Sequence, residues 1–327
     1  MNATHTFRRV LVPAVMALSL VQFGCGPDDN NGTDTNNGTN TTNNGTDGTN
    51  NDTTGTTNNT DNNNNNPNTN NNDSACAVTP DAWSAEGFET NAAEAIALHA
   101  ALGALQGDLM NTAEQSTWGD TPTAAPTEAD VVAAYEAGTP SLADVTPAAL
   151  DTLVRQTFTD WTAAVAEDPA TYMFIDVDGT AWVATGAGGM HERPPSDEGT
   201  RRFRAYGTGG VELRQIVDKG LFVGSLYNYA LSLTEGEITP ATVHAIAAAW
   251  GANPTLTPVV ADGEVDNEGS AHYSQSMGFY DETAAALTAA QAYAADENCV
   301  AERDDALVDV FRLWEEAMFA RGTYYGG

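Results

Sequence analysis

Lysine is nearly absent from this chain. Lys219 is its only lysine, and 12 basic residues stand against 45 acidic ones, which leaves a net charge of −33 at pH 7. Because so acidic a chain repels the phosphates of nucleic acid, the composition excludes DNA and RNA as partners. The charge identifies neither a small ligand nor a protein partner.

Long apolar runs are lacking as well. Beyond the first 24 residues, no stretch approaches the roughly 18 apolar residues that a membrane-spanning helix needs. We therefore expect any attachment to a membrane to lie near the first residues of the chain.

Those first residues have the anatomy of an export signal. Two arginines precede an apolar run over residues 10–21, which is too short to cross a bilayer and ends just before Cys25. Residues 21–25, Val-Gln-Phe-Gly-Cys, resemble the bacterial lipobox, whose cysteine becomes the lipidated first residue of the mature protein. The resemblance implies a signal peptide over residues 1–24 and a lipid on Cys25 that holds the chain to a membrane.

The residues beside Cys25 refine this interpretation. Gln22 takes the place of the usual leucine, so ordinary secretion with Cys25 as an exposed thiol is the alternative. Gly26, rather than an aspartate, follows the cysteine, which resembles lipoproteins that are sorted to an outer membrane. We expect an outer-membrane lipoprotein of the cell envelope that faces either the periplasm or the cell surface.

The stretch after Cys25 cannot form a core. Residues 25–74 consist almost wholly of Asn, Thr, Asp and Gly and, after the cysteine, hold no aromatic or aliphatic side chain to bury. We predict a disordered tether there and a folded domain over residues 75–327.

Two cysteines remain, Cys76 at the start of that domain and Cys299 near its end, and we predict a disulfide between them because an oxidising compartment permits it.

The domain has the pattern of a mainly α-helical bundle. Apolar residues recur at helical spacing in five segments. Those segments are residues 89–115, 128–136, 147–165, 211–233 and 301–321. Gly220 and Gly224, four residues apart in the fourth segment, would let another helix approach closely.

Strand signals are thin. They are limited to residues 172–177 and 181–184, on either side of an Asp-Gly turn, and they predict a short β-hairpin. We expect a helical bundle in one or two lobes, with residues 75–170 and 205–327 as the possible lobes. The hairpin and a glycine-rich loop would lie between the two halves.

Asp176 and Asp178 offer one kind of chemistry. The run Phe-Ile-Asp-Val-Asp-Gly-Thr over residues 174–180 resembles the nucleophile loop of the haloacid dehalogenase phosphatases. The resemblance implies that Asp176 attacks phosphorus, that Asp178 protonates the leaving group and that magnesium offsets the charge. Those enzymes need a parallel sheet, whereas the residues after the run have helix and loop patterns, so a plain turn is the favoured interpretation.

A second resemblance covers residues 170–285. The run Gln-Ile-Val-Asp-Lys-Gly-Leu over residues 215–221 and the run His-Tyr-Ser-Gln-Ser-Met-Gly-Phe over residues 272–279 resemble two segments of imelysin-like bacterial lipoproteins. The resemblance implies a helical periplasmic or surface protein associated with iron acquisition, in a branch of unassigned function. Ser274 and Gln275 replace the acidic pair of that family and offer no anionic oxygen to iron.

Histidines mark the candidate metal site. Gly189-Met-His191 meets half of the imelysin Gly-x-His-x-x-Glu motif, and Pro194 takes the place of its glutamate. His191, Glu192 and His272 are therefore the candidate ligands for iron or another divalent metal. The alternative is that these histidines are hydrogen-bonded structural residues, as we expect for the two inside helical patterns, His99 and His244.

Arginines stand out in so acidic a chain. Arg193 and the three arginines at positions 201, 202 and 204 would bind a carboxylate or phosphate, or else neutralise neighbouring acids.

Taken together, the sequence predicts a non-enzymatic, lipid-anchored protein that binds a metal or a metal-bearing ligand. The alternatives are a surface interaction module without a small ligand and a magnesium-dependent phosphohydrolase built on Asp176 and Asp178.

Overall fold

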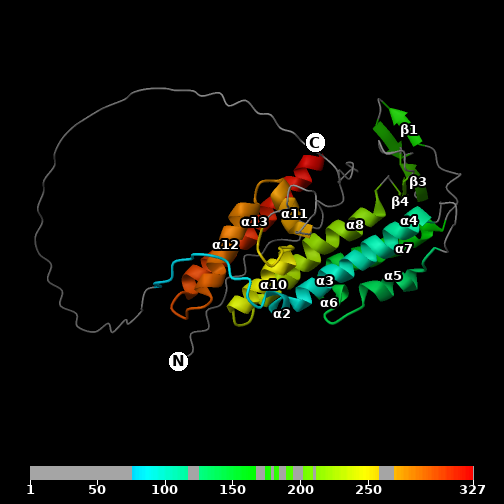
Figure 1. Ribbon diagram of the computed structural model, residues 1–327. Helices are drawn as coiled ribbons and strands as arrows, with labels where there is room; N and C mark the ends of the chain where they lie inside the picture. The colour runs from blue at the N-terminus through cyan, green and yellow to red at the C-terminus, as the bar shows by residue number, and fades with distance from the viewer. Residues whose placement is uncertain are drawn as a thin grey trace, which may run out of the picture. The chain divides into compact units, whose positions relative to one another are not determined.

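A computed structural model describes residues 76–116, 125–166, 174–177, 180–183, 189–193, 202–208, 211–257 and 269–326. These residues are mainly helical, as the sequence predicts (Figure 1). The expected signal peptide, the lipid site at Cys25 and the tether over residues 25–74 lie outside the described residues.

Helices make up most of the first half of the domain. Their bounds are Phe88–Asn91 for α2, Ala93–Gly103 for α3, Ala104–Asn111 for η2, Thr112–Ser116 for α4, Glu128–Tyr135 for α5, Leu142–Val145 for α6 and Ala148–Val165 for α7. Thr127 and Ser141 begin α5 and α6 with capping boxes, because each hydroxyl accepts from a backbone N–H three residues on and an aspartate there accepts in return.

The second half is helical too. Its bounds are Leu213–Lys219 for α8, Gly220–Ser225 for η4, Leu226–Leu233 for α9, Pro240–Trp250 for α10, Gly269–Ser276 for α11, Tyr280–Tyr293 for α12 and Val300–Gly326 for α13. The segments η2 and η4 are π-helical turns inside longer helices, a feature that often lies beside functional sites. All five predicted helical segments are present, and α6, α10, α11 and α12 are additional.

The helix α10 lies at the centre of the domain. Every residue from Val243 to Trp250 is buried, so the helix has no polar face. Thr239 begins it with a capping box, and Gly251 ends it in the left-handed conformation at a φ of 102°. Of the helices described here, α13 is the longest at 27 residues, and none is both long enough and apolar enough to cross a membrane.

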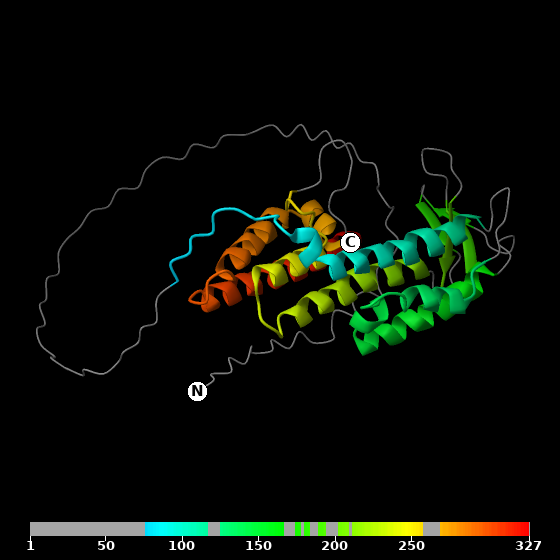
Figure 2. The ribbon, with the colours of Figure 1, turned by 60° about the horizontal axis from the view of Figure 1, so that its bottom comes forward.

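One hydrophobic cluster extends through both halves of the domain. In α7 the side chains of Leu150, Val154, Phe158 and Trp161 recur at helical spacing and are buried. They join a cluster that also contains residues of α3, α8, α9, α10 and α13. The long segment α3–η2–α4 lies beside the segment α8–η4–α9 within it (Figure 2).

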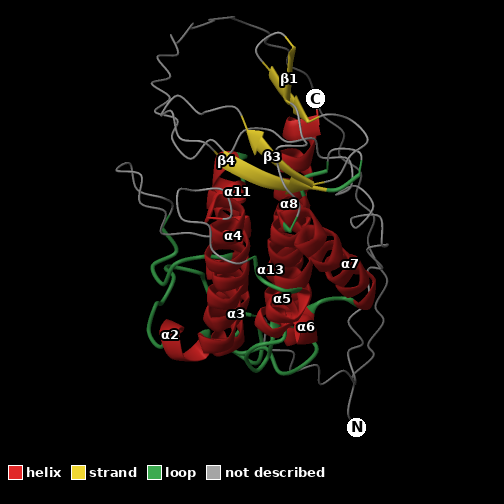
Figure 3. Cartoon of the chain, turned by 90° about the vertical axis from the view of Figure 1, so that its right-hand side faces the viewer, coloured by secondary structure: helices red, strands yellow, loops and turns green. Residues whose placement is uncertain are grey.

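The described strands pair as two antiparallel hairpins. The predicted hairpin joins β1, Phe174–Val177, to β2, Thr180–Val183. A second hairpin, which the sequence did not predict, joins β3, Gly189–Arg193, to β4, Arg202–Tyr206. Both β3 and β4 pack against α7, and β4 also contacts α4 and α8, so this second hairpin lies at one end of those helices (Figure 3).

Gly220 and Gly224 bring η4 close to α7. A β-carbon on Gly220 would lie 3.2 Å from Cδ1 of Leu150, and one on Gly224 would overlap the same leucine. The two glycines therefore allow the close helix approach that their spacing predicts, with Leu150 filling the space that their missing side chains leave.

Side chains fasten the segment before α2 to the core. Trp83 donates from Nε1 to the carbonyl of Pro254 at 2.9 Å, and its ring packs edge-on against His244 at 5.0 Å. The backbone of Ser84 donates to Gln291 Oε1 at 2.8 Å and accepts from Gln291 Nε2 at 2.9 Å. We call Trp83, Ser84, His244 and Gln291 the N-terminal latch.

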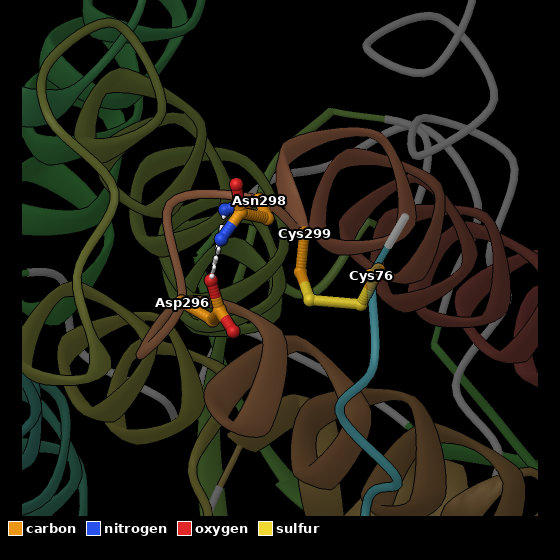
Figure 4. The surroundings of a disulfide bond; sticks show 4 residues. All are labelled: Cys76, Asp296, Asn298 and Cys299. Atoms are coloured by element: carbon orange, nitrogen blue, oxygen red, sulfur yellow. Dashed lines mark hydrogen bonds between the residues drawn. A yellow bond between two sulfur atoms is a disulfide. The ribbon is translucent and has the colours of Figure 1, made fainter. Parts of the chain in front are cut away.

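A disulfide joins Cys76 to Cys299, as the sequence predicts (Figure 4). The two cysteines are 223 residues apart. Cys299 is buried directly before α13, in a turn where Asn298 donates from its backbone and its side chain to Asp296 Oδ1, both at 2.9 Å. The first described residue is thus bonded to the turn between α12 and α13.

The contact between Gly224 and Leu150 predicts a sharp difference between two helical glycines. Gly224→Ala should lower the free energy of unfolding by about 1 to 3 kcal/mol, because the new methyl group overpacks a filled core. Gly103→Ala, where a β-carbon would meet nothing within 4 Å, should be neutral or stabilise by up to about 1 kcal/mol. Urea unfolding measures both, and equal effects of the two substitutions would refute the account.

Candidate functional site

Two segments that the sequence singles out come together in the fold. Residues 215–221 form most of α8 and the start of η4, and His272 begins the other segment within α11. The helix α11 packs against both η4 and α13. Lys219 of the first segment donates a hydrogen bond to the hydroxyl of Tyr273 in the second. The junction of α8, η4, α11 and α13 is therefore the candidate site.

Lys219 supplies a fixed positive charge at this junction. Its Nζ lies 3.1 Å from Asp218 Oδ2, and 26% of its side chain is exposed. Burial lowers the pKa of Lys219, but the charge of Asp218 and the contact with Tyr273 outweigh burial and raise that pKa above its ordinary value. The amine therefore stays protonated at any physiological pH.

Two aromatic rings hold a pair of cations at the site. Phe222 and Tyr273 are stacked, with centroids 5.2 Å apart and planes 12° from parallel. Nζ of Lys219 lies 5.3 Å and 4.8 Å from the two centroids, and Cζ of Arg321 lies 4.9 Å from that of Tyr273. Such cation–π contacts fix the position of a cation and leave its charge in place.

His272 stands beside these cations on α11. Burial lowers the pKa of its imidazole, and the positive charges of Arg321 and Lys219 lower it further. The ring is therefore neutral at pH 7, which is the form that coordinates a metal. Its Nδ1 is buried and has no hydrogen-bond partner among the described residues.

The other two candidate ligands belong to a different part of the chain. His191 and Glu192 lie on β3, opposite Arg204 and Phe203 of β4, and the structure describes the backbone of both without their side chains. Since β3 packs against β4 and α7, the described contacts do not bring these residues to His272. Within the described ranges, no three His, Cys, Asp or Glu side chains form a metal-binding group.

The phosphatase-like run forms a hairpin. Asp176 lies on β1 opposite Ala181 of β2, and Asp178 lies outside the described residues. Both hairpins in the described part of the chain are antiparallel, whereas the phosphatase loop follows a strand of a parallel sheet. The described strands therefore do not supply the scaffold that the phosphohydrolase alternative needs.

Arg204 neutralises buried acids. It forms a cluster with Glu114, Glu212 and Arg214, and all four side chains are buried. Nε of Arg204 lies 3.0 Å from Glu212 Oε1, and Nε of Arg214 lies 3.5 Å from Glu114 Oε2. We call these four residues the buried charge cluster, in which two positive charges balance two negative ones. The side chains at positions 193, 201 and 202 lie outside the described atoms.

Glu114 is the member of the buried charge cluster that titrates near neutral pH. One of its oxygens accepts from Trp161 Nε1 at 2.9 Å and from the backbone N–H of Ala205 at 3.3 Å. Burial raises the pKa of Glu114 to about 7, although Arg214, Arg204 and the hydrogen bond from Trp161 oppose that rise.

His99 and His244 occupy structural positions. His244 bonds through Nε2 to the carbonyl of Ser84 at 2.8 Å and through Nδ1 to the side-chain nitrogen of Asn91 at 3.0 Å. His99 bonds through Nε2 to the carbonyl of Ala249 at 3.2 Å. Both rings thus connect helices of the core, and His272 differs from them in having a buried nitrogen with no described partner.

Comparison of the chain with models of protein families, with curated proteins and with solved structures finds no match. The resemblance to imelysin-like lipoproteins, carried by residues 215–221 and 272–279, therefore stays a prediction. The sequence predicts His272 as a candidate ligand and places Lys219 within residues 215–221, but it gives no role to Arg321. The signal for Arg321 was its rarity as a cation in an acidic chain.

The pKa of Glu114 predicts how stability depends on pH. An unfolded glutamate ionises near pH 4.5, so between that value and about pH 7 the folded state binds more protons than the unfolded state does. The free energy of unfolding should therefore fall as pH rises through this range, by at most about 3 kcal/mol from this one group. Glu114→Gln should remove that part of the loss.

Urea unfolding at pH 5 and pH 8 measures the effect of Glu114. Glu297→Gln, at an exposed position, serves as the control and should follow the parent protein. If Glu114→Gln loses as much stability between the two pH values as the parent does, Glu114 is already ionised at pH 5 and the assignment is wrong.

Proposed function

We propose that this chain is a non-enzymatic lipoprotein of the outer membrane that binds a metal, or a ligand that carries one, at the junction of α8, η4, α11 and α13. The contact between Lys219 and Tyr273 is the observation that carries the proposal, because it joins the two segments that resemble imelysin-like lipoproteins. His272 sits next to that contact.

The chemistry of the site supports a ligand of this kind. His272 would supply a neutral nitrogen, which suits iron and other transition metals. Asp218 would supply a carboxylate oxygen and Tyr273 a hydroxyl group. The incoming ligand or water would complete the coordination of the metal.

The disulfide supports an extracytoplasmic location. A bond between Cys76 and Cys299 fits an oxidising compartment, as expected of a protein that carries an export signal. Two parts of the proposal rest on the sequence alone. They are the membrane attachment through a lipid on Cys25 and the tether over residues 25–74 that would hold the domain away from the membrane.

Metal binding at His272 is testable directly. The protein is purified without chelator, its iron, zinc and copper contents are determined by elemental analysis, and it is titrated calorimetrically with ferric citrate and with zinc, copper and calcium salts. We expect one equivalent to bind, and His272→Ala to weaken binding by about tenfold or more, because it removes a coordinating nitrogen. Ser276→Ala, on the exposed side of α11, is the control and should bind normally.

Two outcomes would count against the proposal. Failure of every probe to bind would favour a surface interaction module without a small ligand. Binding that survives His272→Ala unchanged would place the ligand elsewhere in the chain. A thermal melt of each variant establishes that it is folded, so that a loss of binding is not confused with a loss of structure.

A further inference from the structure

We infer that residues 76–84 form a redox-sensitive strap, one end of which a dithiol opens. Reduction of the disulfide between Cys76 and Cys299 would free residues 76–82, while the N-terminal latch keeps Trp83 and Ser84 against the core. The inference does not depend on ligand binding at the candidate site.

The strap is fastened at its two ends by bonds of different kinds. Cys76 is held covalently to Cys299, in the turn between α12 and α13. At the other end the N-terminal latch holds Trp83 and Ser84 through hydrogen bonds and ring packing, none of which involves either cysteine. A thiol therefore breaks the first fastening and leaves the second chemically intact.

The residues between the two fastenings have little to hold them. None of residues 77–82 belongs to the hydrophobic core cluster, and none forms a hydrogen bond with another described residue. Four of these six residues are exposed. The disulfide is therefore the bond that keeps this stretch in place.

A thiol reaches the disulfide from the side of Cys76. That residue is partly exposed, whereas Cys299 is buried. A thiolate of the dithiol would attack Sγ of Cys76, the sulfur–sulfur bond would break, and Cys299 would leave as a thiolate that takes up a proton. The second thiol of the reagent would then attack the mixed disulfide and release Cys76, so that two electrons and two protons pass from the dithiol to the protein.

The position of Cys299 favours its departure as a thiolate. Its carbonyl accepts from the backbone N–H of Arg303 at 2.9 Å, which makes Cys299 the residue that caps the start of α13. The first turn of a helix has backbone N–H groups without helical partners and a partial positive charge, and both stabilise a nearby anion. The sulfur of Cys299 is therefore a better leaving group than a buried sulfur away from a helix end.

Opening the strap would change where the preceding chain joins the fold. In the oxidised protein the joint is the turn before α13, and in the reduced protein it would be Trp83, which packs on His244 of α10. When fully extended, residues 76–82 would add about 25 Å to the reach of the preceding chain. A dithiol would thus lengthen the chain that leads into the domain without unfolding the domain.

Reduction of the purified full-length protein with dithiothreitol tests the strap. We expect dithiothreitol to reduce the bond between Cys76 and Cys299 without any denaturant. The thermal midpoint should fall by about 10 to 20 °C, because the unfolded chain is no longer closed into a long loop. In the reduced, folded protein, iodoacetamide should modify Cys76 at least about tenfold faster than the buried Cys299, as peptide mass spectrometry measures.

Amide hydrogen exchange at Ser84 tests the second fastening. The N–H of Ser84 donates to Gln291 Oε1 at 2.8 Å, and its protection should change by less than about threefold on reduction. Gln291→Leu should lower that protection by about tenfold in the oxidised and the reduced protein alike, because it removes the acceptor. Gln156→Leu, the same substitution at an exposed position of α7, is the control and should leave Ser84 protected.

Several results would overturn the inference. The strap does not open if the bond resists dithiothreitol until urea unfolds the protein, or if Cys76 is modified as slowly as Cys299. The two fastenings are not independent if reduction alone removes the protection of Ser84. Loss of protection throughout α10 on reduction would mean that the whole domain unfolds, which also contradicts the strap. All of these results come from the parent protein, so they decide the inference even if Gln291→Leu does not fold.

Discussion

The buried charge cluster is the constraint on which the rest of the domain depends. Glu114 comes from α4, Arg204 from β4, and Glu212 and Arg214 from the start of α8, so these three elements must meet before all four charges are balanced. A buried charge without its partner is costly, and Glu212 at the start of α8, as a partner of Arg204, therefore stabilises the docked second hairpin. Once the start of α8 is fixed, Lys219 at its other end is fixed as well, and with it one side of the candidate site.

The sequence predicts the parts of the fold whose apolar residues face one side. The stripe of α7, from Leu150 to Trp161, is visible because polar residues separate its members, and the same holds for α13. The helix α10 is buried all round and is rich in alanine, so it has no stripe to find. The π-helical segments keep nearly the same spacing as α-helix, and the sequence therefore cannot distinguish them.

The candidate site is predictable as residues but not as an arrangement. Lys219 and His272 stand out because the chain has one lysine and few histidines, and the disulfide follows from counting cysteines. The meeting of Lys219 with Tyr273 and Arg321 depends on how α8, α11 and α13 pack, which involves residues far apart in the chain. His191 and Glu192 were grouped with His272 by residue type and by a half-met motif, and the described packing of β3 gives that grouping no support.

The disulfide decides where a mechanical pull enters the domain, and it spares the N-terminal latch. Tension along the chain that precedes Cys76 passes through the sulfur–sulfur bond into Cys299 and the turn before α13. Trp83 and Ser84 lie on the far side of that bond, so their hydrogen bonds to the core carry none of the load. A pulling force applied at the N-terminal end of the domain would therefore be borne by the disulfide. The segment that holds Trp83 and Ser84 would stay packed against α10.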